Sequence, residues 1–223
     1  MAVEDQQQEA LERIREAKRK RRRTLELASL GLKSLPLEIT ELTRLRSLDL
    51  RNNQLTSLPA EIGKLTNLTG LDLAGNQFAS LPPEIEKLTD LMALILSDNK
   101  FVSLSPVIGS FIRLEYLLAD GNQLSSLPPE LGGLKKLVAL TLRGNPLPEA
   151  LLELAEKDTR GALAYIRDEG IEGGEPLYEA KLVLVGEGDV GKTCLLHALQ
   201  GKPFKRQQTT KELLQNLKLN SAR

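Results

Sequence analysis

The chain has 223 residues, with thirty basic and thirty acidic side chains and a formal net charge of zero. This balance argues against a dedicated nucleic-acid binder, whose affinity comes mostly from neutralising phosphates. No apolar run reaches the ~20 residues of a membrane span, the N-terminal stretch is charged where a secretory signal is apolar, and a single cysteine excludes a disulfide framework. We therefore expect a cytoplasmic protein without a transmembrane segment.

The N-terminal stretch, residues 1–23, predicts a capping helix that spans residues 4–23. Its apolar side chains fall on one stripe, made of Ala10, Leu11, Ile14 and Ala17. The run KRKRRR at residues 18–23 admits a second interpretation, as a nuclear-import or nucleic-acid patch. We favour a solvated helix end, because basic side chains suit the negative end of a helix dipole and the chain as a whole is neutral. No nucleic-acid partner is expected.

Leucine makes up 48 of the 223 residues, and its positions in the middle of the chain repeat every 23 residues. Five asparagines keep the same step: Asn53, Asn76, Asn99, Asn122 and Asn145. The leucines that open the units keep it as well: Leu45, Leu68, Leu91, Leu114 and Leu137. Each unit reads LxxLxLxxNxLxxLPxxIxxLxx, and such a period predicts a stack of similar structural units.

The pattern predicts one short strand in each unit, stacked into a parallel sheet. The LxL leucines point inward because side chains alternate along a strand, and the residues between them face the concave surface. The asparagine follows the strand, where its amide can bridge the backbone of neighbouring turns. Ala119 takes an inward slot that leucine holds in other units, so the pattern allows a one-residue irregularity there. The prolines of the LP step, Pro59, Pro82 and Pro128, favour an extended, non-helical convex side.

With this pattern the chain resembles the leucine-rich repeat family, which implies an α/β solenoid with a parallel sheet on its concave face and helical caps. Residues 24–147 make up about six units, the first of which is atypical because Leu30 replaces the asparagine. Residues 148–175 are expected to form the C-terminal helical cap and a linker with Gly-Gly and Pro. The apolar residues that can cover the last strand are Leu151, Leu152, Leu154, Leu163 and Ile166.

The outward strand positions identify a candidate binding surface. Ile95, Tyr116 and Leu118 fall on neighbouring strands and predict an exposed apolar patch. Arg51 and Arg143 occupy outward positions on either side of it. Scattered apolar residues need no such explanation, but three neighbours favour a docking site. We therefore expect the concave face to bind a protein partner or another part of the same polypeptide.

A nucleotide-binding signature follows the linker. Residues 181–185 predict a buried strand, GEGDVGKT fits the P-loop pattern GxxxxGK followed by Ser or Thr, and a helix begins after it. In such a loop, backbone N–H groups surround phosphate oxygens, the lysine reaches the β- and γ-phosphates, and the threonine binds Mg²⁺. The phosphate-binding candidates are Gly186, Gly188, Asp189, Val190, Gly191, Lys192 and Thr193, with Thr193 also the Mg²⁺ ligand.

Repeats, a helical cap and the sequence GEGDVGKTCLLHALQGKPF together resemble the Roco proteins, in which repeats precede a Roc GTPase domain and a COR dimerisation domain. The resemblance implies a homodimeric parent protein that binds Mg²⁺ and GTP or GDP and hydrolyses GTP. It also implies that the concave face of the repeats contacts the GTPase or COR domain. A further Mg²⁺ ligand is implied at Thr209 or Thr210. The choice of guanine over adenine rests on this resemblance alone.

Residues 176–223 are too short for a complete Ras-like GTPase domain, and they lack its DxxG and base-reading motifs. We therefore expect the chain to be a fragment that binds no nucleotide and is inactive by itself. The reason is that an isolated strand, loop and helix cannot form the parallel sheet that supports a P-loop. The alternative is a stand-alone repeat scaffold whose P-loop is vestigial.

Overall fold

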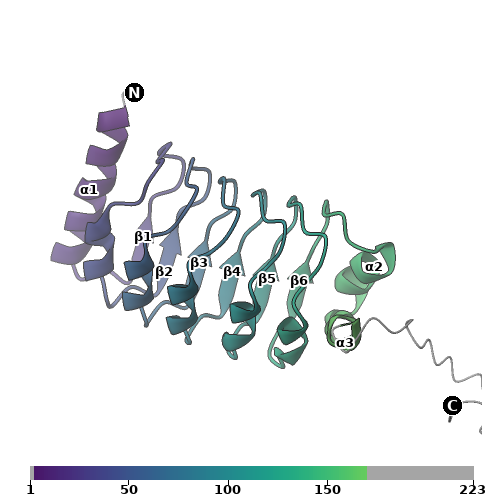
Figure 1. Cartoon of the computed structure of the whole chain (residues 1–223). Helices are drawn as coiled ribbons and strands as arrows, with labels where there is room; N and C mark the ends of the chain where they lie inside the picture. The colour runs from purple at the N-terminus through teal and green to yellow at the C-terminus, as the bar shows by residue number, and fades with distance from the viewer. Residues whose placement is uncertain (1–2, 170–223) are drawn as a thin grey trace, which may run out of the picture. The chain divides into compact units, whose positions relative to one another are not determined.

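Six parallel strands form one sheet in the computed structural model, which describes residues 3–169 (Figure 1). They follow chain order: β1 (Thr24–Glu26), β2 (Ser47–Asp49), β3 (Gly70–Asp72), β4 (Ala93–Ile95), β5 (Tyr116–Leu118) and β6 (Ala139–Thr141). Each strand residue pairs with the one 23 positions further on, as Leu48 does with Leu71. This register confirms the predicted parallel stack, because the sequence period equals the offset between neighbouring strands.

The inward side chains of all six strands form one continuous core. The central leucine of each strand is at most 5% exposed. Ala119 is fully buried in the slot that leucine holds elsewhere, and its N–H donates to Thr141 O at 2.9 Å. The register of β5 with β6 is unbroken. The irregularity that the sequence allowed is therefore absent, because the backbone ladder is maintained even where the core side chain is small.

The convex side is helical, and the prediction of an extended, non-helical convex side is wrong. Within residues 3–169 five 3₁₀ helices cover it: η1 (Leu37–Glu41), η2 (Ala60–Lys64), η3 (Pro83–Lys87), η4 (Pro106–Ser110) and η5 (Pro129–Gly133). Pro59 directly precedes η2, with φ −66° and ψ 146°. A φ near −65° suits the entry to a helical turn as well as an extended chain, so proline precedes η1, η2, η3 and η5, whereas Ser105 precedes η4.

Each buried asparagine joins two neighbouring units through its side chain. Asn76 Nδ2 donates to the carbonyl oxygens of Leu50 and Leu73, both at 2.9 Å. Its Oδ1 accepts a hydrogen bond from Leu55 N at 3.1 Å. Equivalent bonds recur at the other four positions, and all five asparagines are only 6–7% exposed. The predicted bridging role is confirmed, and this set of bonds is called the asparagine ladder below.

Helix α1 (Val3–Arg19) packs on β1 and η1 at the N-terminal end of the solenoid. The stripe predicted from the sequence faces this contact, since Ala10, Ile14 and Ala17 are buried and Leu11 is half-buried. The helix ends before the predicted residue 23 because Arg21 adopts a left-handed φ of 52°. Near this end Lys20 Nζ lies 2.5 Å from Glu16 Oε1, and the hydrogen bond and charge of Lys20 lower the pKa of the Glu16 carboxyl.

Two helices cover the other end of the solenoid (Figure 1). Helix α2 (Glu149–Lys157) packs on β6, and α3 (Thr159–Glu169) packs on η5 and on α2. The predicted cap residues differ in depth: Leu151, Leu163 and Ile166 are buried, whereas Leu152 and Leu154 are partly buried. None of the helices in the described part combines the length and the apolar content that a bilayer crossing requires.

Candidate functional site on the concave face

Rows of outward side chains run across the strands of the sheet. The register places residues that are 23 apart side by side, at the ~4.7–4.9 Å spacing of neighbouring strands. The central row consists of Glu26, Asp49, Asp72, Ile95, Leu118 and Thr141. This row is acidic on β1, β2 and β3 and becomes apolar on β4 and β5. The concave face therefore offers two adjoining surfaces of different chemistry.

An apolar patch lies on β4 and β5. Ile95 and Leu118 are register partners on these strands, and each is only partly buried. Tyr116 is 45% exposed and lies between Ala93 and Ala139 in the neighbouring row. Because both neighbours end at Cβ, the tyrosine ring stands clear of the sheet. The structure thus brings together the three apolar residues that the sequence pattern singled out, and these three are called the apolar patch below.

The two arginines expected beside the patch have partners elsewhere. Arg51 follows β2, two strands from the patch, and its Nε lies 3.2 Å from Oδ2 of Asp49. Arg143 follows β6, and its Nε lies 2.6 Å from Oε1 of Glu156 on α2. Arg51 is therefore remote from the patch, and Arg143 connects the end of the sheet to the C-terminal cap.

Asp49 and Asp72 face each other directly on β2 and β3. Burial raises the pKa of the Asp72 carboxyl, and the charge of Asp49 raises it as well. A hydrogen bond from Ala74 N at 3.0 Å and the charge of Arg51 act against them. No basic side chain among the described residues forms an ion pair with Asp72. Like charges placed opposite each other destabilise a sheet. The sequence pattern marks both residues only as outward-facing and does not predict that they are neighbours. Their offset of 23 residues, equal to the repeat, is the signal that would have predicted this carboxylate pair.

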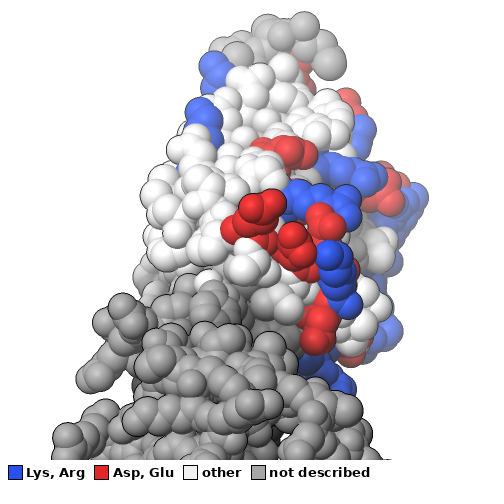
Figure 2. Space-filling view, turned by 90° about the vertical axis from the view of Figure 1, so that its right-hand side faces the viewer, with Lys and Arg blue, Asp and Glu red and all other residues white. Residues whose placement is uncertain are grey.

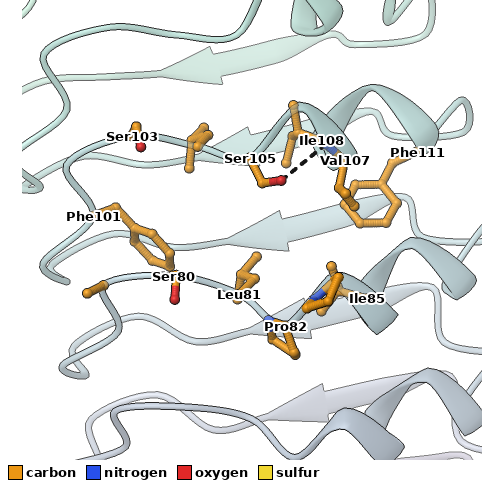
Figure 3. Close-up of a pocket in the computed structure, with 13 residues that line it drawn as sticks. Ser80, Leu81, Pro82, Ile85, Phe101, Ser103, Ser105, Val107, Ile108 and Phe111 are labelled. Atoms are coloured by element: carbon orange, nitrogen blue, oxygen red, sulfur yellow. Dashed lines mark hydrogen bonds between the residues drawn. The ribbon is translucent and has the colours of Figure 1, made fainter.

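A pocket of about 150 Å³ opens on the convex side, between the units that contain η3 and η4 (Figure 3). Leu81, Pro82 and Ile85 line it from one unit, and Ser105 and Val107 line it from the next. Ser105 stands where the neighbouring units carry proline, and its hydroxyl accepts a long hydrogen bond of 3.4 Å from Val107 N. The lining residues carry no charge, so the pocket offers no group for acid–base or metal chemistry.

The predicted nucleotide site lies outside the described residues. It comprises Gly186, Gly188, Asp189, Val190, Gly191, Lys192, Thr193 and the alternatives Thr209 and Thr210. Within residues 3–169, no group of three or more histidine, cysteine, aspartate or glutamate side chains is arranged to hold a metal ion. The concave face of the described part presents apolar and carboxylate side chains on an open sheet.

The described part resembles known proteins. Residues 22–117 match the family model of a leucine-rich repeat region. A leucine-rich repeat protein of Leptospira interrogans shares 44% sequence identity over 52% of this chain, with a TM-score of 0.52. The ectodomain of the Arabidopsis thaliana membrane receptor kinase GASSHO1/SCHENGEN3, solved in complex with CASPARIAN STRIP INTEGRITY FACTOR 2, shares 32% identity over 56% of this chain, with a TM-score of 0.49. The chain spans 30% and 16% of these two proteins. No curated protein matches it.

Proposed function

Since the chain contains a leucine-rich repeat region folded as a parallel solenoid, we propose that its concave face binds a protein partner. The apolar patch of Ile95, Tyr116 and Leu118 carries this proposal. Adjoining exposed apolar side chains on an otherwise polar surface are characteristic of protein interfaces. The register of β4 and β5 makes these side chains neighbours, so they act as one contact surface.

The patch can supply the anchor of an interface. Burying a large apolar side chain completely contributes about 1.5–3 kcal/mol, and tyrosine is enriched among the residues that dominate interface energies. Tyr116 is 45% exposed, so a substantial part of its apolar surface remains to be covered. An apolar side chain of the partner that packs on Tyr116 also meets Ile95 and Leu118, because the three lie on adjoining strands.

The acidic part of the central row indicates the charge of the partner. Asp72 is the register partner of Ile95, so the carboxylate adjoins the apolar patch. A lysine or arginine of the partner beside Asp72 would stabilise the ionised carboxylate, whose solvation burial has already reduced. It would also reduce the electrostatic repulsion between Asp72 and Asp49. The proposed partner is therefore a polypeptide segment that presents an apolar side chain next to a basic one.

Selection of peptides from a random phage-display library on the full 223-residue chain tests this proposal. We expect the selected peptides to combine apolar and basic residues. In fluorescence anisotropy with synthetic copies, Ile95→Asp or Leu118→Asp should weaken binding by about tenfold or more, which corresponds to the loss of one buried apolar contact. Circular dichroism of the variants should match the unaltered protein, because both positions are only partly buried.

Val102→Asp is the matched control, because Val102 is 54% exposed and lies outside the strands of the concave face. It introduces the same charge in place of an aliphatic side chain and should leave the peptide affinity unchanged. Selected peptides that bind Ile95→Asp and Leu118→Asp as tightly as the unaltered chain would exclude the apolar patch as the docking site.

The motif GEGDVGKT supports a second function, in residues outside the described part. We propose that it binds the phosphates of GTP in a Roco-type, homodimeric and cytoplasmic parent protein, with Lys192 at the phosphates and Thr193 at Mg²⁺. In this proposal the repeats regulate the GTPase. GTP hydrolysis by the parent with and without residues 1–175 tests the regulation. A hydrolysis rate that Lys192→Ala leaves unchanged would contradict the nucleotide site.

A further inference from the structure

A strongly basic edge runs along the sheet where its strands begin, the lower edge in Figure 1. This strand-start edge consists of the four residues before each strand: 20–23, 43–46, 66–69, 89–92, 112–115 and 135–138. It holds nine lysine and arginine residues but two acidic ones, although the whole chain is neutral. The fold itself produces this excess charge, because it aligns residues that are 23 apart on one edge.

The unpaired positive charge is concentrated beside β1 and β2. Four exposed arginines there form no ion pair within the described residues: Arg21, Arg23, Arg44 and Arg46. Arg46 N donates to Arg23 O at 2.7 Å, so these two arginines enter neighbouring strands. Of the other basic residues of the edge, Lys20, Arg22 and Arg113 form ion pairs, as Arg113 does with Asp90 at 2.7 Å. Lys135 and Lys136, which precede β6, form none within the described residues. The arginines beside β1 and β2 therefore remain available to an anionic partner.

Aliphatic side chains protrude from the same edge towards β6. Ile112 is 69% exposed, Val138 65% and Met92 37%. Glu115 N donates to Met92 O at 2.8 Å, and Val138 N donates to Glu115 O at 2.8 Å, so Met92 and Val138 continue the row that begins with Arg23 and Arg46. Ile112 lies on the same edge, three residues before Glu115. The strand-start edge thus combines unpaired cations, most of them beside β1 and β2, with exposed aliphatic groups beside β4, β5 and β6.

The convex side and the C-terminal cap lack this combination. The convex helices η1 to η5 carry six glutamates and two lysines, and they are therefore acidic. At the end of the solenoid covered by α2 and α3, positive and negative side chains are intermixed (Figure 2). Beside that end of the edge, Glu156 and Asp158 lie next to Lys157 and Arg160. Of these three surfaces, the strand-start edge alone combines a net positive charge with exposed aliphatic side chains.

We propose that the strand-start edge docks on an anionic lipid surface. Basic side chains bind anionic headgroups additively, and aliphatic side chains insert at the boundary between headgroups and acyl chains. Six strands at their usual spacing give the edge a length of roughly 24 Å, along which it can meet a flat surface. The edge contains no aromatic side chain on which a nucleic-acid base could stack, which favours lipid over nucleic acid. This docking does not depend on the concave face, which stays open in that orientation.

Co-sedimentation of the full chain with vesicles tests the proposal. We expect binding to vesicles of phosphatidylcholine and phosphatidylserine, weaker binding at high salt, and little binding to phosphatidylcholine alone. The double variant Arg44→Ala and Arg46→Ala should lower partitioning by roughly 30-fold. The double variant Ile112→Ser and Val138→Ser should lower the binding that remains at high salt. Lys64→Ala with Lys87→Ala removes the same charge from the convex side and should leave partitioning near its original value.

Three results would contradict docking of the strand-start edge on an anionic lipid surface. Equal binding to neutral vesicles, or an equal loss in the convex control, would show that the arginines of the edge are not the contact. Binding to polyuridylate RNA without binding to anionic vesicles would assign the edge to nucleic acid instead. Ile95→Asp should retain vesicle binding, so failure of the concave-face proposal can be distinguished from failure of this one.

Discussion

Replacement of Asn99 by alanine tests whether the asparagine ladder holds neighbouring units together. Asn99 is 7% exposed, and its Oδ1 accepts a hydrogen bond from Phe78 N at 2.9 Å. Its Nδ2 donates to the carbonyl oxygens of Leu73 at 2.9 Å and Leu96 at 3.0 Å. Alanine supplies neither donor nor acceptor, so the variant removes hydrogen bonds from the backbone of two units at once.

The expected loss follows from the groups that remain without a partner. A buried donor or acceptor left unpaired costs about 1–3 kcal/mol. Phe78 N forms no other hydrogen bond within the described residues, whereas Leu73 O still accepts from Asn76 Nδ2 at 2.9 Å. Loss of the hydrogen bond therefore costs the full desolvation penalty at the Phe78 amide and a smaller one at the Leu73 carbonyl. We expect Asn99→Ala to lower the free energy of unfolding by about 2–4 kcal/mol, a large part of the 5–15 kcal/mol typical of a domain.

Equilibrium unfolding in urea, followed by circular dichroism, measures this loss. Asn67→Ala is the matched control, since Asn67 is exposed and its Nδ2 makes a single hydrogen bond, to Thr43 O at 2.8 Å. That variant should change the free energy of unfolding by less than ~0.5 kcal/mol. Hydrogen exchange at the Phe78 amide reports the broken bond directly. The ladder is not what joins the units if Asn99→Ala costs no more than Asn67→Ala and the Phe78 amide stays protected.

Two further substitutions test the concave and convex sides. Asp72→Asn keeps an acceptor for Ala74 N but removes a carboxylate whose pKa in the folded protein is raised. Because the folded state binds this proton more tightly than the unfolded chain does, ionisation destabilises the fold as the pH rises through that pKa. Asp72→Asn should therefore raise the free energy of unfolding by about 0.2–1 kcal/mol at neutral pH. In urea titrations across pH the gain should fade as the pH drops towards the ordinary pKa of aspartate, and a gain that persists in acid would rule out a charge effect. Ser105→Pro should stabilise the protein by about 0.4–1 kcal/mol in the same assay, because Ser105 already has φ −65° and ψ 144°; destabilisation would show that its N–H or hydroxyl is required.

Much of the candidate site could be predicted because the solenoid maps sequence offset onto spatial distance. Ile95 and Leu118 are 23 residues apart, and the register makes them neighbours. The same rule applies to Arg23 and Arg46, but the basic run at 18–23 taken alone predicts only a solvated helix end. The basic edge becomes visible only when the residues one period later are added to this run.

The convex helices could not be predicted from the prolines alone. The φ of proline is compatible with an extended segment and with the entry to a 3₁₀ turn, so the residue type leaves the choice open. Hydrogen bonds decide it, as when Ile62 N donates to Pro59 O at 2.9 Å and Leu65 N donates to Ile62 O at 3.0 Å. These bonds form because each convex segment must return the chain to the next strand over a short distance while its backbone groups stay satisfied.

The sequence by itself determined the number, order and register of the strands, the inward leucines and the positions of the asparagine ladder. It could do so because each repeat contacts mainly its neighbours, so a local period specifies the long-range contacts. Tertiary structure decided how several charged side chains pair, because their partners do not lie one repeat away. Arg143 pairs with Glu156 on a helix beyond the repeats, Arg51 pairs with Asp49 and not with Asp72, and Arg44 and Arg46 form no ion pair within the described residues. Those outcomes depend on which charged groups come within reach of one another after the chain has folded, and no repeating pattern encodes that competition.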